Sequence, residues 1–417
     1  MLLPIISSAQ ANDKDSIKKD TIMHSMPYQI TFVPPMSTNG FMASKTTHTV
    51  SLNIVAGYNG GVNGIEAAGF ANVLVNDMKG TQAAGFANVV RGNMKGAQAA
   101  GFSNYVHGSS EGIMLAGFTN HSNHGARAVQ AAGFSNQALG SVKGSQLAGF
   151  ANMCKDSLSG LQASGFANYA GSHTSGGQAA GFANVAKGDL QGVQAAGFAN
   201  TAVGEVDGAQ IAGFANAAFN VNGGQASGFL NMADTVRGVQ ISFINVADTF
   251  AKGAPIGFLS YVHKGYRNYS IGVNELGWVE GQFRTGVSRL HNVFAASLNP
   301  IPSMSSWAYG VGLGSKIIDQ SKSDVVLDLM AFHVNERELY TNSFNMLYRL
   351  SARYEYHPKA ERFAFWASPS LNVQQSSYDR FDGSNFKSKL APYTIFDDKG
   401  TYLRSKFWVG LQAGVSF

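Results

Sequence analysis

The segment from Lys95 to Ser110 reads K-G-A-Q-A-A-G-F-S-N-Y-V-H-G-S-S, and it is one copy of a unit that fills half of the chain. Its Gly-Phe step recurs at intervals of sixteen residues. The phenylalanines of these copies are Phe70, Phe86, Phe102, Phe118, Phe134, Phe150, Phe166, Phe182, Phe198 and Phe214. Looser copies follow at Phe229, Phe243 and Phe258. A tandem repeat of short, fixed period is the signature of a repeat architecture.

Residues at even distances from the asparagine of each unit hardly vary, whereas those at odd distances vary and include the charged residues. Gln lies six positions before the Asn, Ala four before and Phe two before. This period-2 segregation predicts extended backbone with one invariant face, which we expect to point inward. The predicted repeat ladder comprises Phe86, Asn88, Gln98, Phe102, Asn104, Phe134, Asn136, Gln146, Phe182 and Asn184.

Two β architectures are compatible with such a unit. In a parallel β-solenoid each unit is one coil, Phe forms an interior column, and Gln and Asn form amide ladders about 4.8 Å apart. In a single large antiparallel barrel, each unit would instead be one strand and one turn. Turns of membrane barrels alternate between short and long, but the linkers here all share one length and chemistry. The uniform linkers therefore favour the solenoid.

The chain changes character after Pro255, where longer aromatic segments alternate with small and polar residues. The last of them places Phe407, Val409, Leu411 and Ala413 on one face and Trp408 on the other. About eight strands of this kind predict an antiparallel, outer-membrane-type β-barrel with an apolar outer face. The alternative is a soluble sheet whose apolar rows face a core.

The composition narrows the class of protein. The 417 residues include 49 glycines and one cysteine, with 13% charged residues and a formal net charge of +5. A single cysteine excludes an internal disulfide framework. Lys and Arg are scattered, so we expect no nucleic-acid partner. No stretch approaches eighteen consecutive apolar residues, so we expect no transmembrane helix.

These patterns divide the chain into four segments. Residues 1–11 resemble the end of a signal peptide, with Ala9-Gln10-Ala11 as a small-x-small cleavage pattern. Residues 12–48 are expected to be an extended lead-in, 49–258 the repeat array, and 259–417 the C-terminal antiparallel barrel or sheet.

Three stretches together resemble a known family. They are the units such as G-V-Q-A-A-G-F-A-N (Gly192 to Asn200), the entry segment S-L-N-I-V-A-G-Y-N-G-G-V-N-G (Ser51 to Gly64), and the final W-V-G-L-Q-A-G-V-S-F. The chain is similar to the surface-repeat proteins of Gram-negative bacteria over most of residues 28–417. The resemblance implies export to the outer membrane or cell surface, and it carries over no catalytic residues. Leu411, Val415 and Phe417 also resemble the assembly signal of outer-membrane barrels.

The sequence contains few groups of residues that could form a catalytic or metal-binding site. His121, Asn123 and His124 lie in a variable linker, where an exposed turn is the simpler interpretation than a metal site. Asp77, Asp156, Asp189 and Asp207 occupy no common repeat position, unlike the aspartates of calcium-binding solenoids. The most highly charged group of nearby residues is typical of a strand that continues into a hydrophilic loop. It comprises Asp324, Asp328, His333, Glu336, Arg337 and Glu338.

We therefore expect no catalytic, cofactor or metal site and no enzymatic activity. The favoured function is a structural or adhesive cell-surface or outer-membrane protein whose repeats are displayed on a barrel anchor. The alternatives are a channel or transporter in which the repeats join the barrel, and an autotransporter-like passenger with its translocator. The expected partners are outer-membrane lipid and the barrel-assembly machinery, with a surface ligand that the sequence does not identify.

Overall fold

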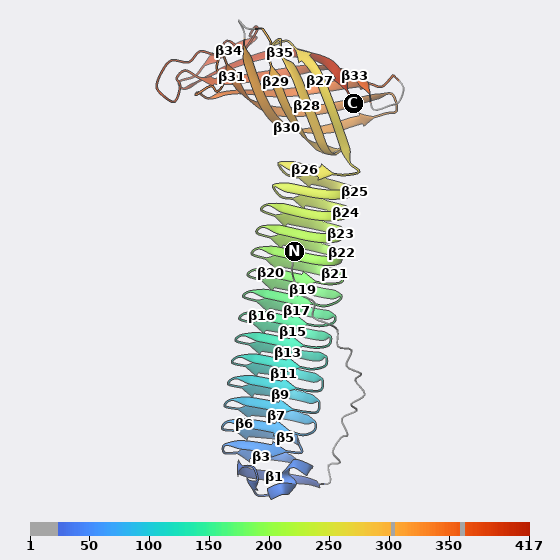
Figure 1. Cartoon of the computed structure of the whole chain (residues 1–417), viewed down its shortest axis with the longest axis vertical. Helices are drawn as coiled ribbons and strands as arrows, with labels where there is room; N and C mark the ends of the chain where they lie inside the picture. The colour runs from blue at the N-terminus through green and yellow to red at the C-terminus, as the bar shows by residue number, and fades with distance from the viewer. Residues whose placement is uncertain (1–23, 302–304, 359–362) are drawn as a thin grey trace, which may run out of the picture. The chain divides into compact units, whose positions relative to one another are not determined.

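The computed structural model describes residues 24–301, 305–358 and 363–417, so the predicted signal-peptide segment 1–11 lies outside the described residues. The chain is all-β apart from one short 3-10 helix in this described part, and it forms two compact units, Met1–Ala180 and Gly181–Phe417. Figure 1 labels many of the strands, numbered in chain order.

In the first unit each sixteen-residue repeat forms one coil with a long and a short strand. The long strands are β3 (Thr46–Asn53), β5 (Gly61–Ala68), β7 (Met78–Ala84), β9 (Met94–Ala100), β11 (Ser110–Ala116), β13 (Ala126–Ala132), β15 (Val142–Ala148), β17 (Leu158–Ser164) and β19 (Thr174–Ala180). The short strands are β4 (Ala56–Asn59), β6 (Ala71–Leu74), β8 (Ala87–Val90), β10 (Ser103–Val106), β12 (Thr119–Ser122), β14 (Ser135–Ala138), β16 (Ala151–Cys154) and β18 (Ala167–Ala170).

Each strand pairs in parallel with its equivalent in the next coil. Gln82 lies beside Gln98 in the β7–β9 pair, and Asn88 lies beside Asn104 in the β8–β10 pair. The predicted β-solenoid is therefore confirmed. The alternative, one antiparallel barrel that includes the repeats, is wrong because the repeat strands run parallel.

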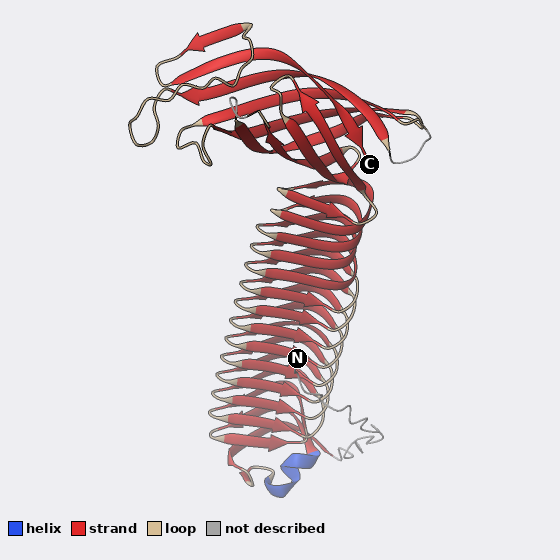
Figure 2. Ribbon diagram, turned by 45° about the horizontal axis from the view of Figure 1, so that its top comes forward, coloured by secondary structure: helices blue, strands red, loops and turns tan. Residues whose placement is uncertain are grey.

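The solenoid begins before the predicted array. β1 (His24–Val33) pairs in parallel with β3 and in antiparallel with the two-residue β2 (Met36–Ser37). The 3-10 helix η1 (Gly40–Lys45) follows and is the blue segment in Figure 2. No helix in the described part of the chain has the length and hydropathy needed to cross a membrane.

The second unit starts with coils of the same kind. Its coil strands are β20 (Ala183–Ala186), β21 (Leu190–Ala196), β22 (Ala199–Ala212), β23 (Ala215–Ser227), β24 (Leu230–Ile241), β25 (Ile244–Ile256) and β26 (Leu259–Val262). From β22 to β25 the short strand of one coil runs directly into the following long strand, because the intervening residues are themselves extended backbone.

Most long strands carry one glycine that is set by close backbone approach, although β13 has Ala128 at this position. Gly96 has φ +128°, and a Cβ there would lie 1.9 Å from the carbonyl oxygen of Gly80 in the neighbouring coil. An alanine would therefore clash with backbone as well as strain its own φ. The recurring glycine allows this close approach between neighbouring coils, and the coil with Ala128 still pairs with both of its neighbours.

The remaining strands form an antiparallel nine-stranded sheet. They are β27 (Tyr266–Asn274), β28 (Val279–Val287), β29 (Leu290–Leu298), β30 (Ser306–Asp319), β31 (Ser323–Glu336), β32 (Asn345–Tyr356), β33 (Ala364–Ser377), β34 (Phe396–Lys399) and β35 (Leu403–Ser416). Neighbouring strands pair in sequence, β33 pairs with β35, and β35 returns to pair with β27. Eight strands thus close into a barrel, and β34 extends the free edge of β35.

Within the second unit the last coil ends against the outer wall of β28 and β29. The Ser260 amide donates to Asn292 Oδ1 at 2.8 Å, and Asn292 Nδ2 donates to the Gly257 carbonyl at 2.8 Å. Thr285 Oγ1 donates to the Ser260 carbonyl at 3.1 Å. These bonds satisfy backbone groups of the last coil that would otherwise have no hydrogen-bond partner at its unpaired edge.

Candidate functional site

The asparagine of each repeat is buried and forms a side-chain ladder along the coils. Asn88 Nδ2 donates to Asn104 Oδ1 at 3.0 Å, and the same bond links Asn136 to Asn152 at 2.9 Å and Asn184 to Asn200 at 2.9 Å. Nδ2 also donates to a main-chain carbonyl of the next coil, as Asn88 does to Ala99 at 2.8 Å. Each buried amide thus has the partners that burial requires.

The glutamines form a second ladder with the opposite direction of donation. Gln98 Nε2 donates back to Gln82 Oε1, and Gln146 donates back to Gln130, each at 2.8 Å. Asn donors therefore point to the following coil and Gln donors to the preceding coil. The predicted amide ladders are present in both compact units.

The predicted interior position of the phenylalanines is wrong. Phe86, Phe102, Phe134 and Phe182 are about 40% exposed, although they do stack as a column. The Phe86 and Phe102 centroids are 4.9 Å apart with parallel rings. The Gly-Phe step is a bend between the long and the short strand. Because a bend resets the alternation of side chains, Phe turns outward although it lies two residues before a buried Asn.

The Gln ladder is interrupted at one coil. Met114 occupies the Gln position between Gln98 and Gln130. Gln130 Nε2 lies 3.5 Å from Met114 Sδ, and Gln98 Oε1 is buried without a hydrogen-bond partner among the described residues. An unsatisfied buried acceptor costs about 1–3 kcal/mol.

At its N-terminal end, the Gln ladder stops at a glutamate that occupies the Gln position of the repeat. Glu66 is buried and accepts from Gln82 Nε2 at 2.8 Å, from Asn59 Nδ2 at 2.5 Å and from Asn53 Nδ2 at 3.1 Å. Burial away from water raises the pKa of its carboxyl above the ordinary value, and the hydrogen bonds that favour the carboxylate offset only part of this shift.

The linker histidines and the single cysteine of the coils have partners or enclosure within the protein. His121 Nε2 lies 2.6 Å from Asn123 Oδ1, while His124 Nδ1 lies 2.9 Å from the His107 carbonyl. Cys154 is buried at a position where most other repeats carry Ala or Val, and burial raises the pKa of its thiol to about 11. His121 thus bonds within its own coil, His124 bonds to the preceding coil, and the thiol is protonated and enclosed.

The outer wall of the barrel carries an aliphatic row across five neighbouring strands. Leu313 pairs with Leu329, Leu329 with Leu350, Leu350 with Leu371, and Leu371 with Val409. Exposed aromatic side chains flank this row on both sides. Towards the end where β27 begins they are Tyr269, Tyr354, Tyr356 and Phe365, and towards the other end Trp307, Tyr309 and Tyr348. Apolar rows that face outward exclude the alternative in which they face a core.

The predicted assembly-signal residues belong to the same wall. Leu411 and Phe417 are exposed and Val415 is half-buried, while Gln412 and Ser416 between them are buried inside. The alternation read from the sequence is therefore present in β35.

The interior of the barrel is filled with paired charges. Arg284 contacts Asp328 at 2.6 Å, Arg349 contacts Glu280 at 2.8 Å, and Arg353 contacts Glu355 at 3.2 Å. All six side chains are buried. Removing one partner of such a pair leaves a buried charge, which costs about 3–5 kcal/mol.

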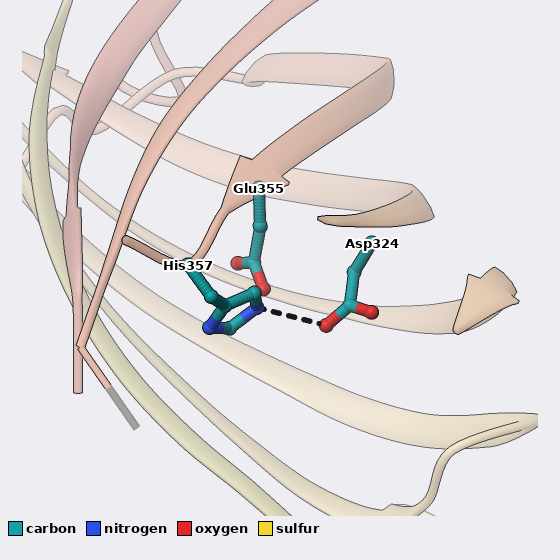
Figure 3. Close-up of side chains that lie close together, drawn as sticks. All are labelled: Asp324, Glu355 and His357. Atoms are coloured by element: carbon teal, nitrogen blue, oxygen red, sulfur yellow. Dashed lines mark hydrogen bonds and ion pairs between the residues drawn. The ribbon is translucent and has the colours of Figure 1, made fainter. Parts of the chain in front are cut away.

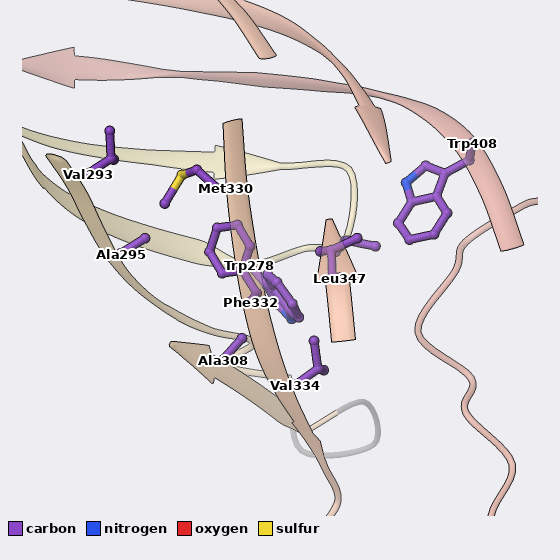
Figure 4. Packing of buried hydrophobic residues seen from close by; sticks show 10 residues of the cluster. Trp278, Val293, Ala295, Ala308, Met330, Phe332, Val334, Leu347 and Trp408 are labelled. Atoms are coloured by element: carbon purple, nitrogen blue, oxygen red, sulfur yellow. The ribbon is translucent and has the colours of Figure 1, made fainter. Parts of the chain in front are cut away.

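Apolar side chains fill another part of the interior (Figure 4). This cluster contains the large buried rings of Trp278, Phe332 and Trp408, together with Leu347 and Met330. Trp278 Nε1 donates to Ser306 Oγ at 2.8 Å, and Trp408 Nε1 donates to Glu275 Oε1 at 2.9 Å. Side chains of both kinds therefore occupy the lumen of this small barrel, as expected for eight strands.

A cavity of about 540 Å³ lies at the end of the barrel where β27 begins. It is lined by Gly265, Tyr266, Arg267, Asn268, Tyr269, Lys316, Asp324, Glu355, His357 and Phe417. Asp324, Glu355 and His357 each place one possible ligand atom within 4.8 Å of the others (Figure 3). These carboxylates and imidazole are the side chains in the described part of the chain that could together hold a metal ion.

This cluster is nevertheless neutralised by the protein itself. Lys316 Nζ lies 2.7 Å from Asp324 Oδ2, and His357 Nε2 lies 3.1 Å from the same oxygen. Glu355 is paired with Arg353. A metal ion would have to displace the Lys316 ammonium, so the geometry fits ion pairing between strand ends better than metal binding.

The charged set singled out in the sequence is dispersed in the structure. Asp324 lines the cavity, and Asp328 pairs with Arg284 inside the barrel. His333 lies against Tyr340, Glu336 accepts from Asn345 at 2.9 Å, and Glu338 pairs with Arg380 at 2.7 Å. Arg337 adopts φ +60° in the loop that follows β31.

The residues that pair with these groups mostly lie far from them in sequence and carry no motif of their own. Glu280, Arg284, Lys316 and His357 are separated from their partners by up to 69 residues. The usable signal was the row of charged residues Arg349, Arg353 and Glu355 opposite the aromatic face of one predicted strand. That row identifies the polar face of the strand, which points into the barrel. Which charged residues form ion pairs depends on the register between strands, and the row does not specify it.

Comparison with known proteins gives no family assignment. No protein-family model, no curated protein and no solved structure matches the chain. The fold and the side-chain geometry are therefore the basis for functional inference.

We predict that Met114→Gln stabilises the coils. The new amide can donate to Gln98 Oε1 and accept from Gln130 Nε2, which closes the gap in the ladder. Hydrogen exchange in β9, β11 and β13 should slow by roughly tenfold, equivalent to about 1.4 kcal/mol. The matched control is Met78→Gln, which buries an amide between Val62 and Met94 and should speed local exchange. Equal effects of both variants would contradict the ladder.

We also predict a pH-dependent contribution from Glu66. Its folded pKa lies above the unfolded value of about 4.5, so the folded state binds this proton more tightly. Stability relative to Glu66→Gln should therefore be greatest below pH 4.5 and fall as the pH rises through the folded pKa. Thermal unfolding of both proteins across this range measures the difference. Glu111→Gln, which removes an exposed carboxylate, is the control; a flat wild-type-minus-E66Q profile would contradict the prediction.

Proposed function

We propose that the chain is a non-enzymatic, outer-membrane-anchored repeat protein, in which the barrel crosses the bilayer and the coils form a structural or adhesive scaffold. The observation that carries this proposal is the polarity of the barrel: a continuous aliphatic row outside and buried ion pairs inside. A soluble barrel would have the reverse arrangement.

Several features support a membrane environment for this wall. A closed sheet leaves no unpaired strand edge along the lipid, where each unsatisfied backbone group is costly. The Leu350 row provides aliphatic contact for hydrocarbon, and aromatic side chains such as Tyr354 and Tyr309 flank it on both sides. Aromatic girdles at both interfaces are typical of outer-membrane barrels.

The filled lumen favours an anchor over a channel or translocator. Arg284, Arg349, Arg353, Trp278 and Trp408 are among the largest fully buried side chains of the described residues. Ions or an extended passenger chain would need these side chains to move out of the lumen. This packing supports neither alternative function.

The connections between strands indicate on which side of the membrane the coils lie. At the end where β27 begins, the connections are residues 288–289, 320–322 and 357–363; at the other end they are residues 275–278, 299–305, 337–344 and 378–402. Outer-membrane barrels have short periplasmic turns and longer extracellular loops. The coils enter β27 through His263–Gly265 at the short-turn end, which favours the periplasmic side.

The repeat pattern also supports membership of the surface-repeat proteins of Gram-negative bacteria. In that setting the expected partners are outer-membrane lipid and the barrel-assembly machinery, which would recognise Leu411, Val415 and Phe417. Display of the coils on the cell surface is the competing arrangement within the same family.

Leu350→Arg tests the membrane anchor. An arginine near the middle of a lipid-facing wall costs about 2–4 kcal/mol, so the fraction of barrel that migrates in the compact, heat-modifiable form on gels should drop. Leu339→Arg is the matched control, because Leu339 is fully accessible in a loop, and it should leave that fraction unchanged. Equal migration of L350R and the wild type after membrane extraction would overturn the anchor.

Protease treatment of cells tests on which side of the outer membrane the coils lie. If the coils are periplasmic, protease should spare them in intact cells and degrade them once the outer membrane is permeabilised. Degradation of the coils in intact cells would show surface display instead. A periplasmic soluble protein of the same cells serves as the control for membrane integrity.

A further inference from the structure

The coils of the first unit carry a continuous apolar surface that no described segment covers. It consists of the Phe70 to Phe166 column and the two neighbouring outward columns of the long strands, and we refer to it as the aromatic face. The two columns contain Ile65, Thr81, Ala97, Ile113, Val129, Ser145, Leu161 and Gly177, and Ala67, Ala83, Ala99, Leu115, Ala131, Leu147, Ala163 and Ala179.

The aromatic face contains no charged residue. On the long strands, exposed charges lie in the next outward column, at positions such as Lys79, Lys95 and Glu111. Exposed apolar patches of a few hundred Å² or more on a soluble surface mark interaction sites. The face therefore needs an occupant.

Its area is large enough for a stable interface. Each of the seven rings from Phe70 to Phe166 exposes about two fifths or more of its side chain. At roughly 200 Å² for a whole phenylalanine, the rings alone present roughly 600 Å². Exposed Ile113, Leu115 and Leu147 add to this. Standard complexes bury about 800 Å² on each partner.

The geometry of the rings restricts what that occupant can be. Phe86, Phe102 and Phe118 stack with centroids 4.9 Å apart and at interplanar angles of 0° and 4°. Each ring face is covered by its neighbour, and only the ring edges reach solvent. Planar or sugar ligands that bind by stacking on an aromatic face therefore find no free face here.

A second copy of the chain meets these restrictions. We propose that the aromatic face is a self-association surface on which two copies pair through their Phe columns. A partner that contacts many coils at once must repeat its own contacts every 4.9 Å, and an identical face has that same period. Pairing of identical, regularly spaced side chains is the packing used in steric zippers. A two-fold pair buries the same face on both copies and is closed.

The test uses the full chain in detergent micelles, with mass measured by sedimentation over a range of protein concentrations. The wild type should sediment as a dimer. Ala83→Lys with Ala99→Lys places two charges on the aromatic face, leaves every Phe in place, and should weaken the dimer at least tenfold. Asn63→Lys with Ser159→Lys adds the same charge in the column of Lys79 and Lys95, and should leave the dimer intact.

Two results would overturn the proposal. One is a wild-type monomer at all concentrations. The other is a dimer that both double variants retain equally, which would place association on the barrel or elsewhere. Hydrogen exchange of β7 and β9 in A83K/A99K establishes that the coils remain folded. If those coils have unfolded, a cysteine at Ala99 in a Cys154→Ala background replaces the test: absence of cross-linked dimer in cell membranes would reject the interface.

Discussion

The buried side-chain amide is the constraint on which the coils depend. An Asn or Gln inside a protein is tolerated only where its donors and acceptors are matched. In the regular coils the match is the equivalent residue of an adjacent coil, except beside Met114. Asn104 reaches Asn120 and Gln98 reaches Gln82 only if the coils stack in register and in parallel. A slip of one residue would break both ladders at every coil, so register, strand direction and coil spacing follow from one requirement.

The buried polar groups of the barrel find their partners in a different way. Its inward charges are paired between strands that are distant in sequence, as Arg349 is with Glu280. Such pairs contribute little net stability when compared with apolar packing. In this barrel the ion pairs fill the lumen with polar side chains, so the apolar rows of the wall can face outward. The same division of side chains gives the barrel both a lipid-compatible surface and a closed interior.

The sequence predicted the coils and the closed sheet well because both rest on period-2 alternation, which is local. It failed for the phenylalanines because the alternation was counted through the Gly85–Phe86 bend, where the two strands of a coil change direction. It also did not bring Asp324, Glu355 and His357 together. Asp324 and Glu355 are cross-strand neighbours in the β31–β32 pair. That pairing depends on the strand register, and composition and alternation do not specify it.

The opposite directions of the two ladders have a consequence for the history of the array. Within the part of sixteen-residue period, each coil except the one with Met114 offers the same Asn donor on one side and the same Gln donor on the other. A recombination event that removes or duplicates one whole unit joins two coils that already fit each other. The length of the scaffold can therefore change between generations without new compensating substitutions, whereas the entry coil at Glu66 and the exit coil held by Asn292 must each be kept.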